Sequence, residues 1–303
     1  MNRFLAELDP AERVGIFTLA EQVSGRVQEW ARPYGVFEAQ RFATTGLTMA
    51  AAAPWVPVEA LATMAALTLW IFTVDDWLDR GVLAPAERRA RVGEYAAVAA
   101  GAGPPGRDPL ARALCDIGRE LAARPLWGAL APVWATACRA MLTGMVAECE
   151  AGERVRAGGA WPSLRTYMEH GVESIGVRLY LVGAWAVVGG PGTAARLPQL
   201  RRLARSAGRA LRLANDLRTL PRERQEGNAN VLLVLGRAGW PAEAAEAHVR
   251  QWAARCVRRT LAAAGRLAGE PAAALTARVC RFAVDFYDEH DFHTVPQGRI
   301  RAV

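Results

Sequence analysis

The segment LWIFTVDDWLDR at residues 69–80 joins an apolar run to three closely spaced carboxylates. Apolar residues recur at three- and four-residue spacing over residues 57–80, which predicts a largely buried helix. On that helix, Asp75, Asp76 and Asp79 project toward one side near the C-terminal end. A helix C-terminus already carries partial negative charge, so carboxylates that gather there require a cation.

A divalent metal ion is the cation that these carboxylates favour. Three acids on one side of a helix repel one another, and burying one without a partner costs several kcal/mol. Oxygen ligands with no Cys or His beside them indicate Mg²⁺, with Mn²⁺ possible, rather than Zn²⁺. The alternative is a solvated acidic helix end that pairs with Arg80.

A second set of oxygen ligands occurs in the stretch RLANDLRTLPRERQEGNAN. Asn215, Thr219 and Glu223 stand at i, i+4 and i+8, so on a helix they fall within about 80° of one another. Their amide, hydroxyl and carboxylate oxygens suit a further Mg²⁺ ion. Arg222 points between them and can reach a phosphate oxygen, while Pro221 should kink or loosen the turn. The alternative is an ordinary amphipathic helix.

Helical periodicity extends over almost the whole chain and predicts an all-α bundle. The segments with this periodicity are 11–30, 57–80, 85–100, 109–123, 128–151, 163–188, 196–225, 241–268 and 272–290. Many boundaries coincide with Pro85, Pro125, Pro162, Pro191, Pro241 and Pro271. With 52% hydrophobic residues and no composition break among its 303 positions, the chain is expected to form a single domain over residues 1–303.

The cysteines and the N-terminus bear on the cellular compartment. The five cysteines are widely spaced without a CxxC pair, which argues against a disulfide framework and against a zinc site. The N-terminus lacks an export signal, and no apolar run reaches about 18 uncharged residues. We therefore expect a cytoplasmic protein with reduced thiols and no membrane span.

Every one of the 37 basic residues is arginine, and the net charge is +7. Arginine suits phosphate because its planar fork donates two hydrogen bonds at once. Nucleic-acid binding is a competing, non-enzymatic interpretation, with LRRLARSAGRALRLANDLR as its candidate patch. That patch has no interleaved aromatic residues, and its arginines are spread around the helix.

The two carboxylate motifs resemble those of a known enzyme family. DDWLD after LWIFTV, followed about 140 residues later by NDLRTLPRE, resembles the DDxxD and (N/D)Dxx(S/T)xxxE signatures of class I terpene synthases. The order, separation and helical setting of the motifs match over essentially the whole chain. The resemblance implies an all-α fold around a deep apolar cavity, with both metal-binding helices at its mouth and three Mg²⁺ ions holding the substrate diphosphate.

The resemblance also implies roles for the residues of both motifs. The metal ligands would be Asp75, Asp79, Asn215, Thr219 and Glu223. Among them Asp75 would be the principal ligand of the first motif and Asp79 a secondary one, whereas the family often turns the residue at Asp76 toward arginine.

The implied reaction is the ionisation of an allylic isoprenoid diphosphate. Metal ions and arginines stabilise the departing diphosphate, and cavity shape and aromatic faces then direct the allyl cation. The candidate cavity aromatics are Trp70, Phe72, Tyr167, Tyr180, Trp185, Phe286 and Tyr287. For each of them, an ordinary place in the core is the alternative.

Two arginines that are common in the family are missing at their usual positions. Alignment on Tyr167 and on SIG at 174–176 puts Gly171 where many bacterial members carry a diphosphate-sensing arginine, and Arg178 is the candidate replacement. Near the C-terminus an Arg-Tyr pair is expected where Phe292 and His293 stand.

These losses resemble the bacterial diterpene synthases and indicate a C20 substrate, either bicyclic copalyl diphosphate or linear geranylgeranyl diphosphate. The alternatives are a sesquiterpene synthase acting on farnesyl diphosphate and, in a different class, a chain-elongating prenyltransferase. The second motif argues against chain elongation, because that family carries two Asp-rich motifs. The family is often dimeric, so a homodimer is a further expectation.

Overall fold

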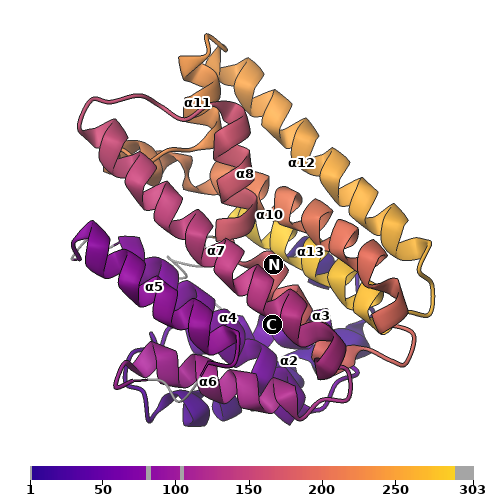
Figure 1. Cartoon of the computed structure of the whole chain (residues 1–303). Helices are drawn as coiled ribbons and strands as arrows, with labels where there is room; N and C mark the ends of the chain where they lie inside the picture. The colour runs from indigo at the N-terminus through magenta and orange to yellow at the C-terminus, as the bar shows by residue number, and fades with distance from the viewer. Residues whose placement is uncertain (1, 80–82, 103–105, 291–303) are drawn as a thin grey trace.

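The computed structural model describes residues 2–79, 83–102 and 106–290, and every regular element in those ranges is a helix (Figure 1). The first half contains α1 (Arg3–Ala6), α2 (Pro10–Ala31), α3 (Arg41–Ala52), α4 (Val58–Asp79), α5 (Pro85–Ala99), α6 (Pro109–Ala122) and α7 (Trp127–Arg156). The second half contains α8 (Leu164–Ser174), α9 (Val177–Val188), a 3₁₀ turn (Ala194–Arg196), α10 (Leu197–Glu226), α11 (Val231–Arg237), α12 (Ala242–Gly265) and α13 (Pro271–Glu289). The predicted all-α fold is confirmed.

Several helices begin at a proline that follows an acidic cap. The Asp9 carboxylate accepts a hydrogen bond from the Ala11 amide at 2.8 Å, and the Asp108 carboxylate accepts one from Leu110 at 2.7 Å. A carboxylate there satisfies an amide that has no partner within the helix, and proline at the first helical position sacrifices no hydrogen bond. Local sequence therefore fixes these starts, close to where periodicity and proline predicted them.

One predicted helix, residues 163–188, is two helices in the structure. The chain breaks between α8 and α9 at Gly176, where φ is 73°. A Cβ at this position would meet Ile71 Cγ2 at 2.5 Å, so both the backbone conformation and the packing require glycine. The break matters because Ser174 and Ile175 line the pocket described below.

Two elements next to the site were not predicted: α3, which carries Arg41, and α11, which begins directly after Asn230. The α3 segment RFATTGLTMAAA is rich in Ala and Thr and is buried on nearly all sides, so it shows no polar face with a helical period. The α11 segment has only seven residues. Tertiary packing rather than amphipathic pattern stabilises both.

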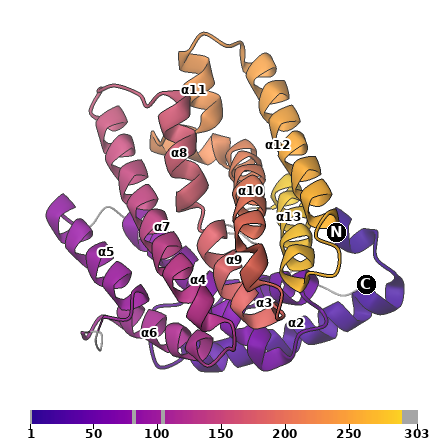
Figure 2. The same cartoon turned by 45° about the vertical axis from the view of Figure 1, so that its right-hand side comes forward.

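The helices pack around a central group formed by α4, α9 and α10 (Figures 1 and 2). Helices α12 and α13 run beside α10, whereas α2 and α3 pack against α4. Helix α7 contacts α4, α8 and α9 from the other side. This arrangement brings the C-terminal parts of α4 and α10 to one pocket although they are far apart in sequence.

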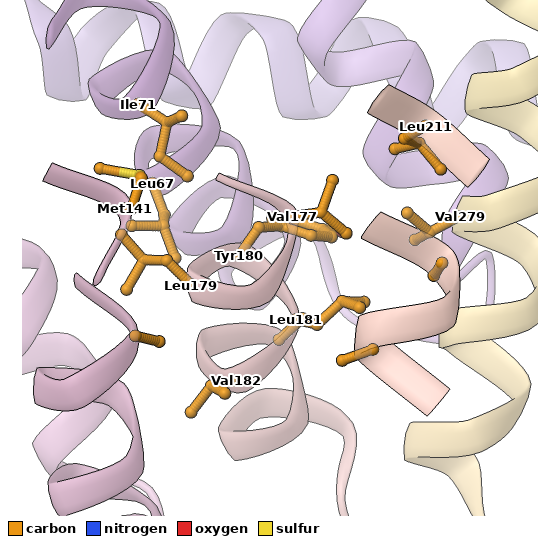
Figure 3. Close-up of a cluster of buried hydrophobic side chains, with 14 of the residues drawn as sticks. Leu67, Ile71, Met141, Val177, Leu179, Tyr180, Leu181, Val182, Leu211 and Val279 are labelled. Atoms are coloured by element: carbon orange, nitrogen blue, oxygen red, sulfur yellow. The ribbon is translucent and has the colours of Figure 1, made fainter. Parts of the chain in front are cut away.

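Apart from Arg178 near its start, α9 is apolar on all sides because the core surrounds it. Figure 3 shows its side chains among residues from α4, α7, α10 and α13, with Tyr180 between Ile71 and Leu181. The Tyr180 hydroxyl lies 3.4 Å from the Met49 sulfur, so this ring belongs to the core. Burial at this density supplies most of the stability of such a bundle.

Three stretches are long and apolar enough to cross a membrane by length and composition: Val58–Asp79, Trp127–Arg156 and Leu164–Val188. The sequence predicted no membrane-spanning segment, because its uninterrupted apolar runs are short. A helix that carries a few polar residues can still be apolar on average. The most apolar parts of the three are 67%, 50% and 72% buried inside the protein. Core packing accounts for much of their hydrophobicity.

Candidate active site

A pocket of about 770 Å³ lies between α4, α7, α8 and α10, within the size range of small-molecule sites. Apolar side chains on its wall include Ile71, Phe72, Met145 and Ile175. Its acidic lining residues are Glu38, Asp75, Asp76, Asp79, Glu148, Glu153, Glu223 and Glu226, and its arginines are Arg41, Arg156, Arg212 and Arg222. Acids thus outnumber arginines around this pocket in a protein whose net charge is +7.

The three carboxylates of α4 all line this pocket, but they are held differently. Asp76 makes a two-pronged ion pair with Arg41 of α3, with N–O distances of 2.7 and 2.9 Å. Arg41 is only 5% exposed, and its guanidinium lies 5.4 Å from the centre of the Phe72 ring. This geometry agrees with the expectation that Asp76 turns toward an arginine. Asp75 is half-buried and Asp79 is exposed at the rim.

The oxygen ligands expected on α10 follow one face of a helix that continues through Pro221. Asn215 and Glu223 line the pocket, whereas Thr219 is buried beneath them and is not among the lining residues. The Thr219 hydroxyl donates to the Asn215 carbonyl at 2.9 Å. The Thr219 hydroxyl oxygen can bind a cation only if this side chain becomes accessible.

Asn230 orients this face and was missed in the sequence analysis. Its amide nitrogen donates to a Glu223 carboxylate oxygen at 2.6 Å and to the Asp216 carbonyl at 2.8 Å. Its side-chain oxygen accepts from the Leu232 amide at 2.9 Å and so caps α11. An asparagine directly before the apolar run VLLVL is a helix-start signal that could have drawn attention to it.

A buried ion network lies one turn before Asn215 on α10. Arg212 pairs with Asp216 at 2.9 Å and with Glu148 of α7 at 2.8 Å. It also donates to the hydroxyl of Tyr167 and, at 3.4 Å, to that of Ser174, both on α8. The Tyr167 hydroxyl donates in turn to both Asp216 oxygens, at 2.8 and 2.9 Å.

Burial dominates the electrostatics of this network. It raises the pKa of Asp216 and of Glu223 above their usual range, and Arg212 opposes the rise in both. Burial also raises the pKa of Tyr167, which therefore stays neutral and acts as a hydrogen-bond donor. An arginine among acids in so dry a site is strongly held, because losing one partner leaves a buried charge uncompensated.

The chemistry of the lining residues fits a hard divalent cation. In the described part of the chain, no three His, Cys, Asp or Glu side chains are grouped closely enough to hold a metal by themselves. The local excess of acid and the carboxylate, amide and hydroxyl oxygens of the two motifs nevertheless suit Mg²⁺ or Mn²⁺ bound together with an anionic ligand. Asp75, Asp79, Asn215 and Glu223 are the accessible donors.

The structure separates the two arginines proposed for diphosphate binding. Arg222 lines the pocket, with Nε 3.8 Å from a Glu226 oxygen. Arg178 does not line it, because the turn at Gly176 directs its side chain to Glu173, 2.5 Å away. In this arrangement Arg178 does not reach the pocket, and its replacement of the missing sensor stays an untested prediction.

Arg80, Phe292 and His293 lie outside the described residues.

The candidate aromatic residues divide into two groups. Those that line the pocket are Phe72, Tyr167 and Tyr287. Those that do not, contrary to expectation, are Trp70, Tyr180, Trp185 and Phe286. The Trp70 indole donates to the Leu110 carbonyl at 2.8 Å and that of Trp185 to the Thr276 hydroxyl at 3.1 Å, so each indole is anchored in the core. Phe286 packs in an apolar cluster with Phe282 and Tyr287.

A comparison with family models identifies the kind of protein. The model of terpene synthase family 2, described as C-terminal metal binding, matches residues 66–259, well over half of the chain. This chain belongs to the terpene synthase family. The matched segment contains both motifs, and membership identifies the chain as an enzyme whose family binds a metal. The recognition of a class I terpene synthase from its motifs is confirmed.

Individual relatives agree with this assignment. The chloroplastic dolabradiene synthase KSL4 of Zea mays is 31% identical over 212 residues, which cover 64% of this terpene synthase and 24% of the relative. The chain therefore spans about a quarter of the length of that curated relative. Among solved structures, an ancestral reconstruction called SVS_A2 aligns with a TM-score of 0.71 at 22% identity, covering 89% of this chain and 84% of the other.

A bacterial enzyme shares the fold as well. The linalool/nerolidol synthase of Streptomyces clavuligerus aligns with a TM-score of 0.70 at 19% identity, covering 89% of this chain and 94% of the other. At these identities the structural matches bear on the fold alone. They agree with the all-α architecture expected from the sequence.

Proposed function

We propose that this enzyme ionises an allylic isoprenoid diphosphate with divalent metal ions and directs the resulting carbocation to a cyclised or rearranged diterpene. The observation that carries the proposal is the single pocket that receives both motifs and joins them to an apolar wall. The C–O bond breaks heterolytically, its electron pair leaves with the diphosphate, and loss of a proton or capture of water ends the cation's rearrangement. Diphosphate is the second product.

The metal ions, three of them by the family resemblance, would be held by Asp75, Asp79, Asn215, Thr219 and Glu223 and would supply positive charge to the leaving diphosphate. Arg222 donates hydrogen bonds to phosphate oxygens from the same rim. Arg41 engages the carboxylate of Asp76, and Asp75 and Asp79 line the same pocket. No protein nucleophile takes part.

The apolar wall performs the second half of the reaction. Phe72, Tyr167 and Tyr287 offer ring faces that stabilise positive charge without reacting with it. Because Tyr167 is neutral and its hydroxyl is fixed on Asp216, its ring orientation is set before substrate enters. Ile71 and Met145 restrict the folding of the hydrocarbon chain by shape alone.

The proposed substrate is a C20 diphosphate, with bicyclic copalyl-type preferred over linear geranylgeranyl diphosphate. A rigid bicyclic hydrocarbon orients itself by burial, worth about 0.8 kcal/mol per CH₂, and needs fewer diphosphate contacts than a flexible C15 chain. Gly171 removes one such contact from α8. The diphosphate class is supported by the linalool/nerolidol synthase structure, which was solved with 2-fluorogeranyl diphosphate.

The decisive experiment is a competition among substrates. The purified protein is incubated with Mg²⁺ and linear C10, C15 and C20 diphosphates and bicyclic C20 diphosphate, and the products are separated by gas chromatography. We expect the highest kcat/KM for a C20 substrate and a kcat/KM lower by about 10²-fold or more in the Asp75→Ala variant. Faster and cleaner turnover of farnesyl diphosphate would assign the enzyme to the sesquiterpene synthases. Longer diphosphates formed after addition of isopentenyl diphosphate would indicate chain elongation.

A further inference from the structure

Gly171 in the middle of α8 is a glycine that the backbone does not require. It has no positive φ, and glycine inside a helix is unfavourable relative to alanine by about 1 kcal/mol. The reason for it is space. A Cβ at this position would meet Arg212 of α10 at Nε, Cζ and Cδ, at 2.9, 3.1 and 3.2 Å. The guanidinium of Arg212 therefore lies directly against the bare backbone of α8.

The contacts of Arg212 show that it joins three helices. From α10 it reaches Glu148 on α7 and Tyr167 and Ser174 on α8, and its guanidinium carbon lies 4.9 Å from the Tyr167 ring centre. Asp216, one turn further along α10, closes the network. The side chain is 8% exposed and still lines the pocket.

Ser174 connects this arginine to the break between α8 and α9. The Ser174 hydroxyl accepts from Arg212 and donates to the Gly171 carbonyl at 3.3 Å. Ser174 is the last residue of α8, and Ile175 and Gly176 form the break that follows. Because Ser174 and Ile175 line the pocket, the position of Arg212 helps to set the shape of the pocket wall.

Arg212 also stands in register with the metal-ligand face of α10. It precedes Asn215 by three residues and Asp216 by four, so it continues that face one helical turn deeper. A fixed positive charge below the expected cations and beside the helix break is well placed to influence how an anionic group is held above it.

We propose that Gly171 and Arg212 act as one unit, in which α10 supplies the guanidinium that α8 lacks at position 171. Arg212 is a positioning residue: it holds the α8–α9 break in the conformation that binds the substrate's diphosphate. The inference rests on the proposed function only in requiring that the pocket binds diphosphate, whatever the length of the hydrocarbon.

The test is a double-mutant cycle read by binding rather than turnover. Inorganic diphosphate is titrated in the presence of Mg²⁺ into the full chain and into the variants Gly171→Ala, Arg212→Lys and both together, by isothermal calorimetry. Each single change should weaken diphosphate binding by about tenfold. In Gly171→Ala the added methyl group displaces the Arg212 guanidinium, and in Arg212→Lys the lysine lacks the planar fork of the guanidinium. The double change should weaken it by less than about threefold more.

The matched control is Gly208→Ala, which adds a methyl group to the same pair of helices. Its Cβ would meet Val172 at 3.5 Å, an ordinary contact, so diphosphate affinity should stay within about twofold of the original. Hydrogen exchange supplies a second readout. Diphosphate with Mg²⁺ should slow amide exchange over residues 171–178 in the original protein and in Gly208→Ala, but not in Arg212→Lys.

The outcomes separate the two levels of inference. If folded Gly171→Ala and Arg212→Lys keep full diphosphate affinity and differ only in thermal stability, Arg212 is merely structural and the inference is overturned. The inference is also overturned if the double variant binds diphosphate about a hundredfold more weakly than the original protein, because independent tenfold losses would multiply. If the unaltered protein itself binds no diphosphate, the proposed function fails. If Arg212→Lys does not fold, the diphosphate affinities of Gly171→Ala and Gly208→Ala still test the inference.

Discussion

The end of α4 and the ligand-bearing face of α10 bring oxygen atoms to the same pocket in opposite ways. On α4, Asp75 and Asp79 stand at the rim, half-buried and exposed. On α10, Thr219 and Asp216 are buried, and their polar groups are already engaged within the protein. The first region is ready to take up ions from solvent, and the second must be held in shape by its neighbours.

The comparison shows that a metal-binding motif can be local or distributed. The α4 carboxylates follow one another on a single helix, and Asp76 pairs with Arg41 of α3. The α10 face depends on Glu148 of α7, on α8 through Tyr167, and on Asn230 at the start of α11. Mutation of Asp79 at the rim of the first region should affect ion binding with little effect on stability, whereas mutations in the buried network of the second should affect folding as well.

The largest effect should come from removing the cation or one of its accessible ligands. Chelation should abolish turnover, and Asp75→Ala or Asn215→Ala should each lower kcat/KM by about 10²-fold or more while helicity measured by circular dichroism stays intact. Both regions should respond alike, because they serve one ion cluster. Full activity in chelator would refute the role of both.

The next effect should distinguish the two regions by stability. Asp216→Ala leaves Arg212 without one of its two carboxylate partners in a dry site and should lower the free energy of unfolding by about 3 kcal/mol. Asp79→Ala, at the exposed rim, should change it by less than about 0.5 kcal/mol. Urea unfolding followed by circular dichroism measures both. Equal effects would erase the contrast between a local and a distributed motif.

The ion pair between Arg41 and Asp76 tests whether the α4 region is wholly local. Arg41→Ala removes a buried partner and should destabilise the protein by about 3 kcal/mol, whereas Arg41→Lys retains one charge-assisted bond and should cost about half as much. Thermal unfolding of the two variants provides the comparison. If Arg41→Ala leaves stability unchanged, the position of Asp76 does not depend on its ion pair with α3.

The smallest effect should fall on the rim of α10. Arg222 is partly exposed and its ion pair with Glu226 is long, so its replacement should leave stability nearly unchanged. Arg222→Lys should lower kcat/KM by a few fold and Arg222→Ala by about tenfold or more, since lysine keeps the charge and loses the fork. Steady-state kinetics measure both changes. If both variants keep the kcat/KM of the unaltered enzyme, Arg222 does not act in the site.

Much of the fold and of the ligand set was predictable because both depend on short-range patterns. The helical period and the prolines at segment boundaries predicted the long helices. The i, i+3 and i+4 spacing predicted that the residues of each motif share one helix face. The ion pair of Arg178 with Glu173, across the turn at Gly176, was not predictable from spacing alone. Arg212 was within reach, since it lies three residues before Asn215, but only its contacts distinguish it from the other arginines.

The sequence by itself determined an all-α chain with two oxygen-rich motifs, because helix formation and side-chain periodicity act over a few residues. Only the tertiary structure decided which aromatic rings face the pocket, which arginine holds Asp76 and why position 171 is glycine. Those features join residues that lie 35 or more positions apart in sequence. Their distances depend on how whole helices pack, and a local pattern carries no record of that packing.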